Sequence, residues 1–201
     1  MNIDLFPLIL FVTATTFSPG PNNIASASMG IQYGYRKTRG FLLGISAGFF
    51  MVMICCAVLS GWMLQLLPAA EQYLRWLGTL YILWLAVNTL LSGNAAAGEK
   101  GDRRAFAKGF VLQLFNPKVA VYGMTLFSTF LAPASGRRLV LVCFAAGFAA
   151  VAFTATSVWA LCGAAIKNRL ADDWFAKRVR LVLALLLIYT AVDLSGVLTR
   201  F

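Results

Sequence analysis

Length and composition place this chain among membrane proteins. Of its 201 residues, 60% are hydrophobic and 12% are charged, whereas a soluble domain averages about 45–50% apolar and about 25% charged residues. The formal net charge of +10 does not predict nucleic-acid binding. The cations fall in short connections between apolar runs, where membrane insertion requires them and where they attract anionic lipids.

The absence of histidine restricts the functions that this chain can have. The sequence has no histidine, which is the commonest general base and the commonest metal ligand. Its seven acidic residues fall mostly in the connections. We therefore expect no enzyme, no metal site and no cofactor. No cleavable signal peptide is expected either, since the apolar run at residues 5–17 lacks a basic leading segment.

Six apolar segments predict an all-α, polytopic membrane protein with six transmembrane helices. A membrane-spanning helix needs about 20 apolar residues, and the whole chain is predicted to form a single transmembrane transporter domain over residues 1–201. In chain order the segments cover residues 5–32, 41–67, 76–91, 109–131, 139–166 and 181–198.

The connections differ in positive charge, which predicts the orientation. Residues 36–39, 100–108 and 167–180 hold twelve of the 17 Lys and Arg residues, and the connections on the other side hold four. Cation-rich connections stay in the cytoplasm, so both termini are expected outside. A re-entrant first segment would instead move the N-terminus inward.

A proline-rich interruption breaks the first apolar segment. In a bilayer core, only protein or a water-filled cavity can satisfy the backbone groups that a proline leaves unpaired. Asn22 and Asn23 begin the next helical stretch, where a favoured capping residue and free N–H groups suit a carboxylate or a phosphate. We predict a substrate site at Pro19, Gly20, Pro21, Asn22 and Asn23. The alternative is a kink that neighbouring helices satisfy.

A second interruption, Asn116-Pro117-Lys118, breaks the fourth segment. Lys118 lies about ten residues beyond the start of its span, which is roughly 15 Å deep at helical rise. An ionisable residue at such a depth predicts function, either binding of a substrate carboxylate or proton exchange. The alternative is a lysine that reaches toward the cytoplasm. Gln113 is expected on the same face as Lys118, and all four residues are predicted to bind substrate.

Asp193 is the one acidic residue well inside an apolar segment. It is a candidate for carrying a coupling proton or for pairing with Lys118. Its place near the outer end of the sixth segment is equally compatible with a hydrated surface side chain.

Recurring motifs predict two inverted three-helix repeats with broken first and fourth helices. The halves cover about 1–92 and 105–201, and the glycine-rich residues 93–104 form the linker. Three spans in each half invert the second half in the membrane, and paired helix breaks in such halves mark a transporter's substrate site. The matching triplets are residues 17–19 with 115–117, 47–49 with 146–148, and 86–88 with 191–193.

A series of glycines lies around the start of the second segment. Spacing of small residues by four positions lets helices approach closely. We therefore predict helix packing for Gly30, Gly34, Gly40, Gly44 and Gly48.

These motifs resemble the LysE/RhtB amino-acid exporter family over essentially the whole chain. The resemblance is carried by Ser-Pro-Gly-Pro-Asn-Asn at 18–23, the basic stretch at 34–40, residues 81–86, and Gln-Leu-Phe-Asn-Pro-Lys at 113–118. It implies export of amino acids from a bacterial cytoplasm across the inner membrane, in exchange for protons. Membrane lipids are expected to surround the protein, and the sequence is compatible with a homodimer.

Within that family, the chain is most similar to the cysteine/O-acetylserine exporters, through residues 20–23 and the pair Tyr122-Gly123. This implies a small neutral amino acid as substrate. Asn88 stands where family members often carry a cation, which argues against a dibasic substrate. An exporter of homoserine, threonine or basic amino acids is the alternative within the family. A passive channel or an intramembrane enzyme is the alternative outside it.

Overall fold

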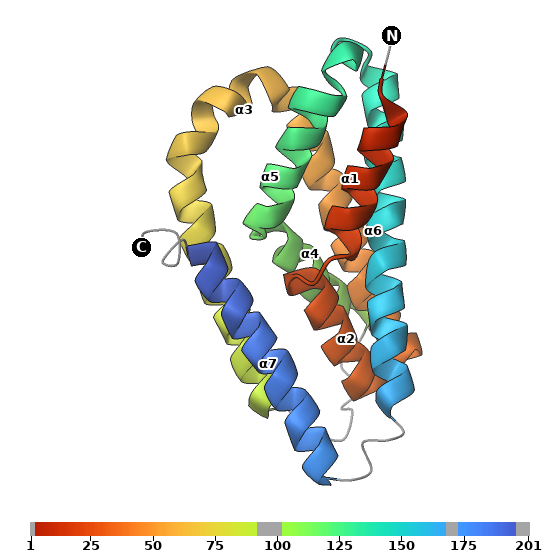
Figure 1. Cartoon of the computed structure of the whole chain (residues 1–201), viewed down its shortest axis with the longest axis vertical. Coiled ribbons are helices and arrows are strands. Elements are labelled where there is room, and N and C mark those ends of the chain that lie inside the picture. The colour runs from red at the N-terminus through yellow and green to blue at the C-terminus, as the bar shows by residue number, and fades with distance from the viewer. Residues whose placement is uncertain (1–2, 92–101, 168–172, 196–201) are drawn as a thin grey trace.

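The computed structural model describes residues 3–91, 102–167 and 173–195, except for the side chains of 59–75 and of scattered helical positions. Every regular element in these ranges is helical, as predicted, and none is a strand (Figure 1). Two described stretches, Tyr35–Val58 and Arg138–Ile166, are long and apolar enough to cross a membrane.

The first apolar segment is split into two helices, as its prolines predict. Helix α1 covers Leu5–Phe17, and α2 covers Pro21–Tyr33. Helix α2 ends at Gly34, whose φ of 78° is a left-handed value that favours glycine. Gly34 therefore terminates α2, and the packing role predicted for it stays a prediction.

Helix α3 runs without interruption over Tyr35–Leu91, which is 57 residues. The predicted connections at 36–39 and 68–75 are therefore wrong, because the backbone is helical through both. The helix instead bends at the upper end of the molecule (Figure 1). We call the parts before and after this bend its first and second arms, and they correspond to the second and third predicted spans. Its only proline, Pro68, lies between the arms, and proline bends a helix because it lacks an N–H donor.

The fourth segment is broken at the predicted place. Helix α4 covers Asp102–Leu114, and α5 covers Pro117–Thr125. A π-helix at Leu126–Phe130 and a short 3-10 helix at Ala132–Ala134 follow, neither of which the sequence predicted. Residues 93–101 of the predicted linker, which covers 93–104, lie outside the described residues.

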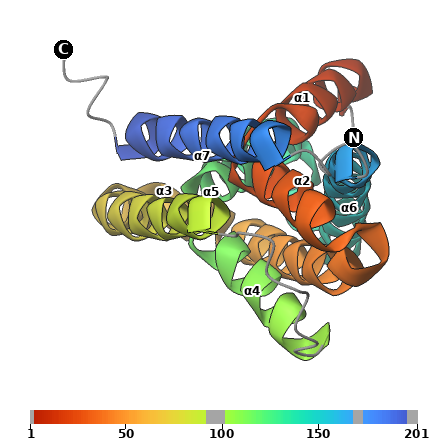
Figure 2. The same ribbon diagram turned by 90° about the horizontal axis from the view of Figure 1, so that it is seen from below.

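Two long helices complete the chain. Helix α6 covers Arg138–Lys167, and α7 covers Asp173–Ser195. The end of α2, the start of α3, the end of α6 and the start of α7 lie together at the lower end in Figure 1. The cation-rich stretches 36–39 and 177–180 therefore belong to helices that begin at the same end of the bundle, which Figure 2 shows from below.

Glycines bring the helices of the lower half close together. A methyl group on Gly30 of α2 would overlap the carbonyl oxygen of Ala160 in α6, and one on Gly163 would overlap that of Ala27. Close backbone approach of this kind is how membrane helices associate, which confirms the packing role predicted for Gly30. The same reciprocal contact joins α3 to α4 through Gly44, Phe106, Gly109 and Phe41.

Candidate substrate site

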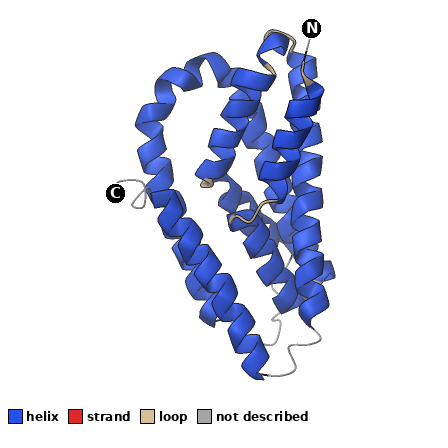
Figure 3. Ribbon diagram, in the orientation of Figure 1, coloured by secondary structure: helices blue, strands red, loops and turns tan. Residues whose placement is uncertain are grey.

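The two helix breaks meet inside the bundle. In Figure 3 the irregular segment between α1 and α2 lies close to the one between α4 and α5, at mid-height of the molecule. Two hydrogen bonds join them directly: Asn116 Nδ2 donates to Asn22 Oδ1 at 3.1 Å, and Lys118 Nζ donates to Ser18 Oγ at 2.9 Å. Residues almost 100 positions apart therefore form one polar centre.

The first break is closed by its own side chains. Gly20 is the N-cap of α2, and the N–H of Ile24 is the first to bond back, to Gly20 O at 2.9 Å. The preceding N–H groups of Asn22 and Asn23 belong to the first turn, where a helix leaves its donors free. The Asn23 side chain does not cap α2. Its Nδ2 donates to Thr16 O and to Ser18 O, both at 2.8 Å.

The second break depends on the first for its side-chain partners. Asn116 is the N-cap of α5, and its carbonyl oxygen accepts from Val119 and Ala120. Its side chain makes no capping bond and reaches Asn22 instead. Pro117 opens α5, where its missing N–H costs nothing.

Lys118 is the positive charge at this centre. Its side chain is half-buried, and its ammonium group donates to Ser18 Oγ, which in turn donates to Thr15 O at 2.8 Å. The ammonium also lies against the backbone of Gly20, because a methyl group there would stand 3.2 Å from Nζ. Lys118 therefore points into the junction of the two breaks.

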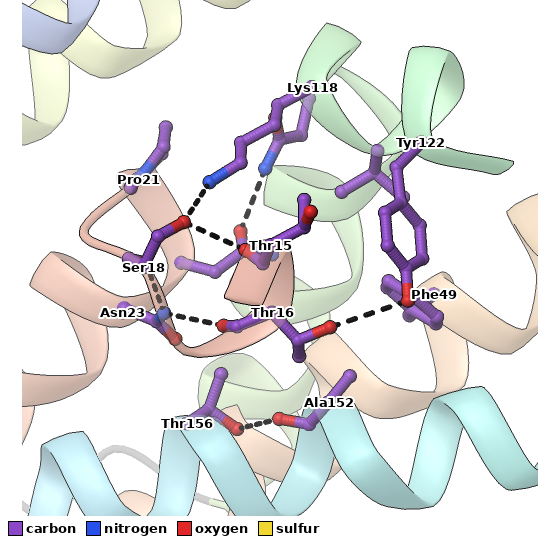
Figure 4. A pocket seen from close by; sticks show the side chains of 14 residues that line it. Thr15, Thr16, Ser18, Pro21, Asn23, Phe49, Lys118, Tyr122, Ala152 and Thr156 are labelled. Atoms are coloured by element: carbon purple, nitrogen blue, oxygen red, sulfur yellow. Dashed lines mark hydrogen bonds between the residues drawn. The ribbon is translucent and has the colours of Figure 1, made fainter. Parts of the chain in front are cut away.

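A cavity of about 50 Å³ opens beside the lysine (Figure 4). This volume admits a few water molecules. None of the described residues that line it is acidic. The lining residues are Thr15, Thr16, Ser18, Gly20, Pro21, Asn22, Asn23, Phe49, Asn116, Lys118, Val119, Tyr122, Ala152 and Thr156.

Most of the predicted site residues line this cavity, and the exceptions have clear reasons. Pro19 is exposed and points away from it. Gln113 lies behind the wall, because its Oε1 accepts a 2.6 Å hydrogen bond from Asn22 Nδ2. The predicted common face of Gln113 and Lys118 is wrong, since the helix is interrupted between them. The side chains of Pro117 and Asp193 lie outside the described residues.

Several lining residues were not predicted. Thr15, Thr16 and Ser18 form a hydroxyl-rich end to an apolar helix, and that signal was available in the sequence. Phe49 and Ala152 come from α3 and α6 and carry no local signal. Tyr122 lines the cavity and is stacked on Phe11, with ring centroids 5.6 Å apart.

Comparisons with known proteins find relatives over most of the chain. The family model described as LysE type translocator matches residues 13–196. Relatives named cysteine/O-acetylserine efflux protein, from Escherichia coli strain K12 and Shigella flexneri, are each 34% identical over 182 residues, which are 90% of this chain and 92% of theirs. No solved structure matches the chain.

Proposed function

Because the chain belongs to the LysE type translocator family, a family of membrane transporters, we propose that it exports small neutral amino acids from the cytoplasm. Cysteine and O-acetylserine are the proposed substrates. The names of the relatives, which align over 90% of the chain, support this choice. The relatives are from Escherichia coli and Shigella, which supports a bacterial inner membrane as the location.

The position of Lys118 carries the proposal. Its ammonium meets Ser18 Oγ and lies beside Gly20 at the start of α2. The partial positive charge of a helix N-terminus adds to the charge of the lysine. A carboxylate that enters this cavity would replace Ser18 as the partner of Lys118 and accept from the free N–H groups of Asn22 and Asn23.

The same charge argues for a neutral over a basic substrate. A zwitterion brings one carboxylate and one ammonium group, and the cation and N–H donors of the cavity match the carboxylate. A dibasic amino acid would add a second ammonium beside Lys118, and the described lining residues include no acidic side chain to balance it. Homoserine and threonine, which are also zwitterionic, remain in the substrate panel of the test below.

Six spans arranged as two inverted repeats, with halves of about 1–92 and 105–201, form the proposed transport machinery. The running directions of the helices support this arrangement. Helices α1 and α2 descend in Figure 1, whereas α4 and α5 ascend, and the first arm of α3 and helix α6 also run in opposite senses. Proton antiport is the proposed coupling, with Asp193 as the candidate proton carrier from its sequence position.

Transport by purified protein in proteoliposomes tests the function. Vesicles preloaded with unlabelled cysteine should accumulate labelled cysteine by counterflow, which a passive channel would not produce. A panel with O-acetylserine, homoserine, threonine and lysine ranks the substrates, and an imposed pH gradient tests proton coupling. If none of the panel is transported, the proposal is wrong.

Cysteine labelling tests the proposed orientation, with the cation-rich end in the cytoplasm and the N-terminus outside. In a cysteine-free background, Lys37→Cys and Arg103→Cys should resist an impermeant maleimide added to intact cells and should react after the cells are opened. Labelling of either position from outside would overturn the orientation.

A further inference from the structure

Three amide side chains form a hydrogen-bonded relay beneath the cavity. Asn22 stands in the middle: its Nδ2 donates to Gln113 Oε1 at 2.6 Å, and its Oδ1 accepts from Asn116 Nδ2 at 3.1 Å. The relay connects the end of α4, the start of α2 and the break before α5. It therefore fixes how the Asn116 amide faces the cavity.

Each end of the relay leaves one buried polar atom without a partner. These atoms are Gln113 Nε2 and Asn116 Oδ1, on side chains that are 0% and 5% exposed. Reversing all three amides would instead leave Gln113 Oε1 and Asn116 Nδ2 unpartnered, so the orientation in the structure is the one that leaves an acceptor at Asn116. A buried polar group without a partner is destabilising by about 1–3 kcal/mol, and proteins retain few of them.

Only one of these two residues borders the cavity. Asn116 lines it, whereas Gln113 does not. The cavity otherwise offers donors, namely the ammonium of Lys118 and the N–H groups of the first turn of α2. An amide oxygen among them supplies the acceptor that a zwitterion needs for its own ammonium group.

We propose that Asn116 Oδ1 accepts a hydrogen bond from the substrate's α-ammonium group, and that Gln113 is a positioning residue that orients the Asn116 amide through Asn22. This inference rests on the proposed function, and it assigns the two charged groups of the substrate to opposite ends of one site. Lys118 takes the carboxylate, and Asn116 takes the ammonium.

The test compares L-cysteine with 3-mercaptopropionate, which keeps the thiol and the carboxylate but lacks the amino group. Both are measured under reducing conditions, as inhibitors of labelled cysteine counterflow. A hydrogen bond to a charged group is worth about 1.5–3 kcal/mol. The wild-type protein should therefore bind cysteine roughly 10–150-fold more tightly than the analogue. Asn116→Leu should bring the ratio close to one, because it removes the acceptor that only cysteine can use.

Two further variants separate positioning from structural damage. Gln113→Met replaces a side chain that does not line the cavity, so it should reduce the preference for cysteine several-fold without weakening the analogue. Lys118→Met should weaken both ligands alike, because both carry the carboxylate.

The outcomes distinguish this inference from the proposed function. If wild-type protein transports cysteine but binds the analogue equally well, the ammonium assignment is wrong and the transport function stands. The same conclusion follows if Asn116→Leu keeps the wild-type ratio, or if Gln113→Met weakens both ligands by the same factor. If neither ligand binds the wild-type protein, both proposals fall together.

Discussion

The two helix breaks use the same device but differ in how they are stabilised. Both restart a helix with a proline in its first turn and with an N-cap residue that makes no side-chain capping bond. At the first break, Asn23 folds back onto the carbonyls of Thr16 and Ser18. At the second, the side chains of Asn116 and Lys118 have their partners across the cavity.

This difference predicts separate roles for the two breaks in the proposed site. The first is held in shape by its own side chains, so we expect it to act as a scaffold that presents N–H groups and hydroxyls. The second contributes the charge, and we expect a substrate to replace its side-chain contacts. Substitutions at the first break should therefore reduce stability, and substitutions at the second should reduce affinity.

The largest effect is expected at the first break. Asn23→Leu preserves the branched shape of a buried side chain but removes the donor shared by two carbonyl groups. Each unpartnered group is destabilising by about 1–3 kcal/mol, and we expect a total loss of roughly 2–6 kcal/mol. Unfolding in detergent, followed by circular dichroism, measures the loss. An unchanged midpoint would show that the break does not depend on Asn23.

Lys118→Met is the matched substitution at the second break. It should weaken substrate binding roughly 10–150-fold, because a charge-assisted contact is worth about 1.5–3 kcal/mol. Its unfolding midpoint should stay near that of the wild type, since a single hydroxyl is the hydrogen-bond partner of the lysine among the described residues. Lys118→Arg should rescue affinity only in part, because a planar guanidinium does not replace a compact ammonium. Wild-type affinity in counterflow with Lys118→Met would contradict the proposed site.

Gly20→Ala probes the contact between the breaks and should have a smaller effect. The added methyl group would stand 3.2 Å from Lys118 Nζ, so the ammonium must shift by a few tenths of an ångström. We expect a loss of affinity below about tenfold, which corresponds to less than about 1.4 kcal/mol. In the Lys118→Met background the same substitution should have no further effect. Equal losses in both backgrounds would show that Gly20 acts independently of the lysine.

Tyr122→Phe should have the smallest effect. The Tyr122 hydroxyl lies 3.4 Å from Thr16 Oγ1, which is long for a hydrogen bond between hydroxyl groups. Its removal should change the affinity by less than about threefold, because the weak contact contributes under about 0.5 kcal/mol. A larger change in the counterflow assay would indicate that the hydroxyl contacts the substrate directly.

The sequence by itself determined the helical class, the places of both breaks and the cation-rich end. These features depend on local chemistry: proline cannot donate at Pro21 or Pro117, and a lysine within an apolar run stands out by composition alone. The family resemblance followed from the same motifs. The sequence did not foresee the continuous helix α3, because an apolar run with a polar middle is compatible with either a loop or a bent helix.

Only the tertiary structure decided which atoms meet. It turned Gln113 away from the cavity and onto Asn22, directed Asn23 back to the carbonyls of the break, and set Lys118 against Ser18. These contacts join residues from different helices or from opposite sides of a break, so no local periodicity encodes them. They result from how closely the helices approach, which the glycines of α2, α3, α4 and α6 permit.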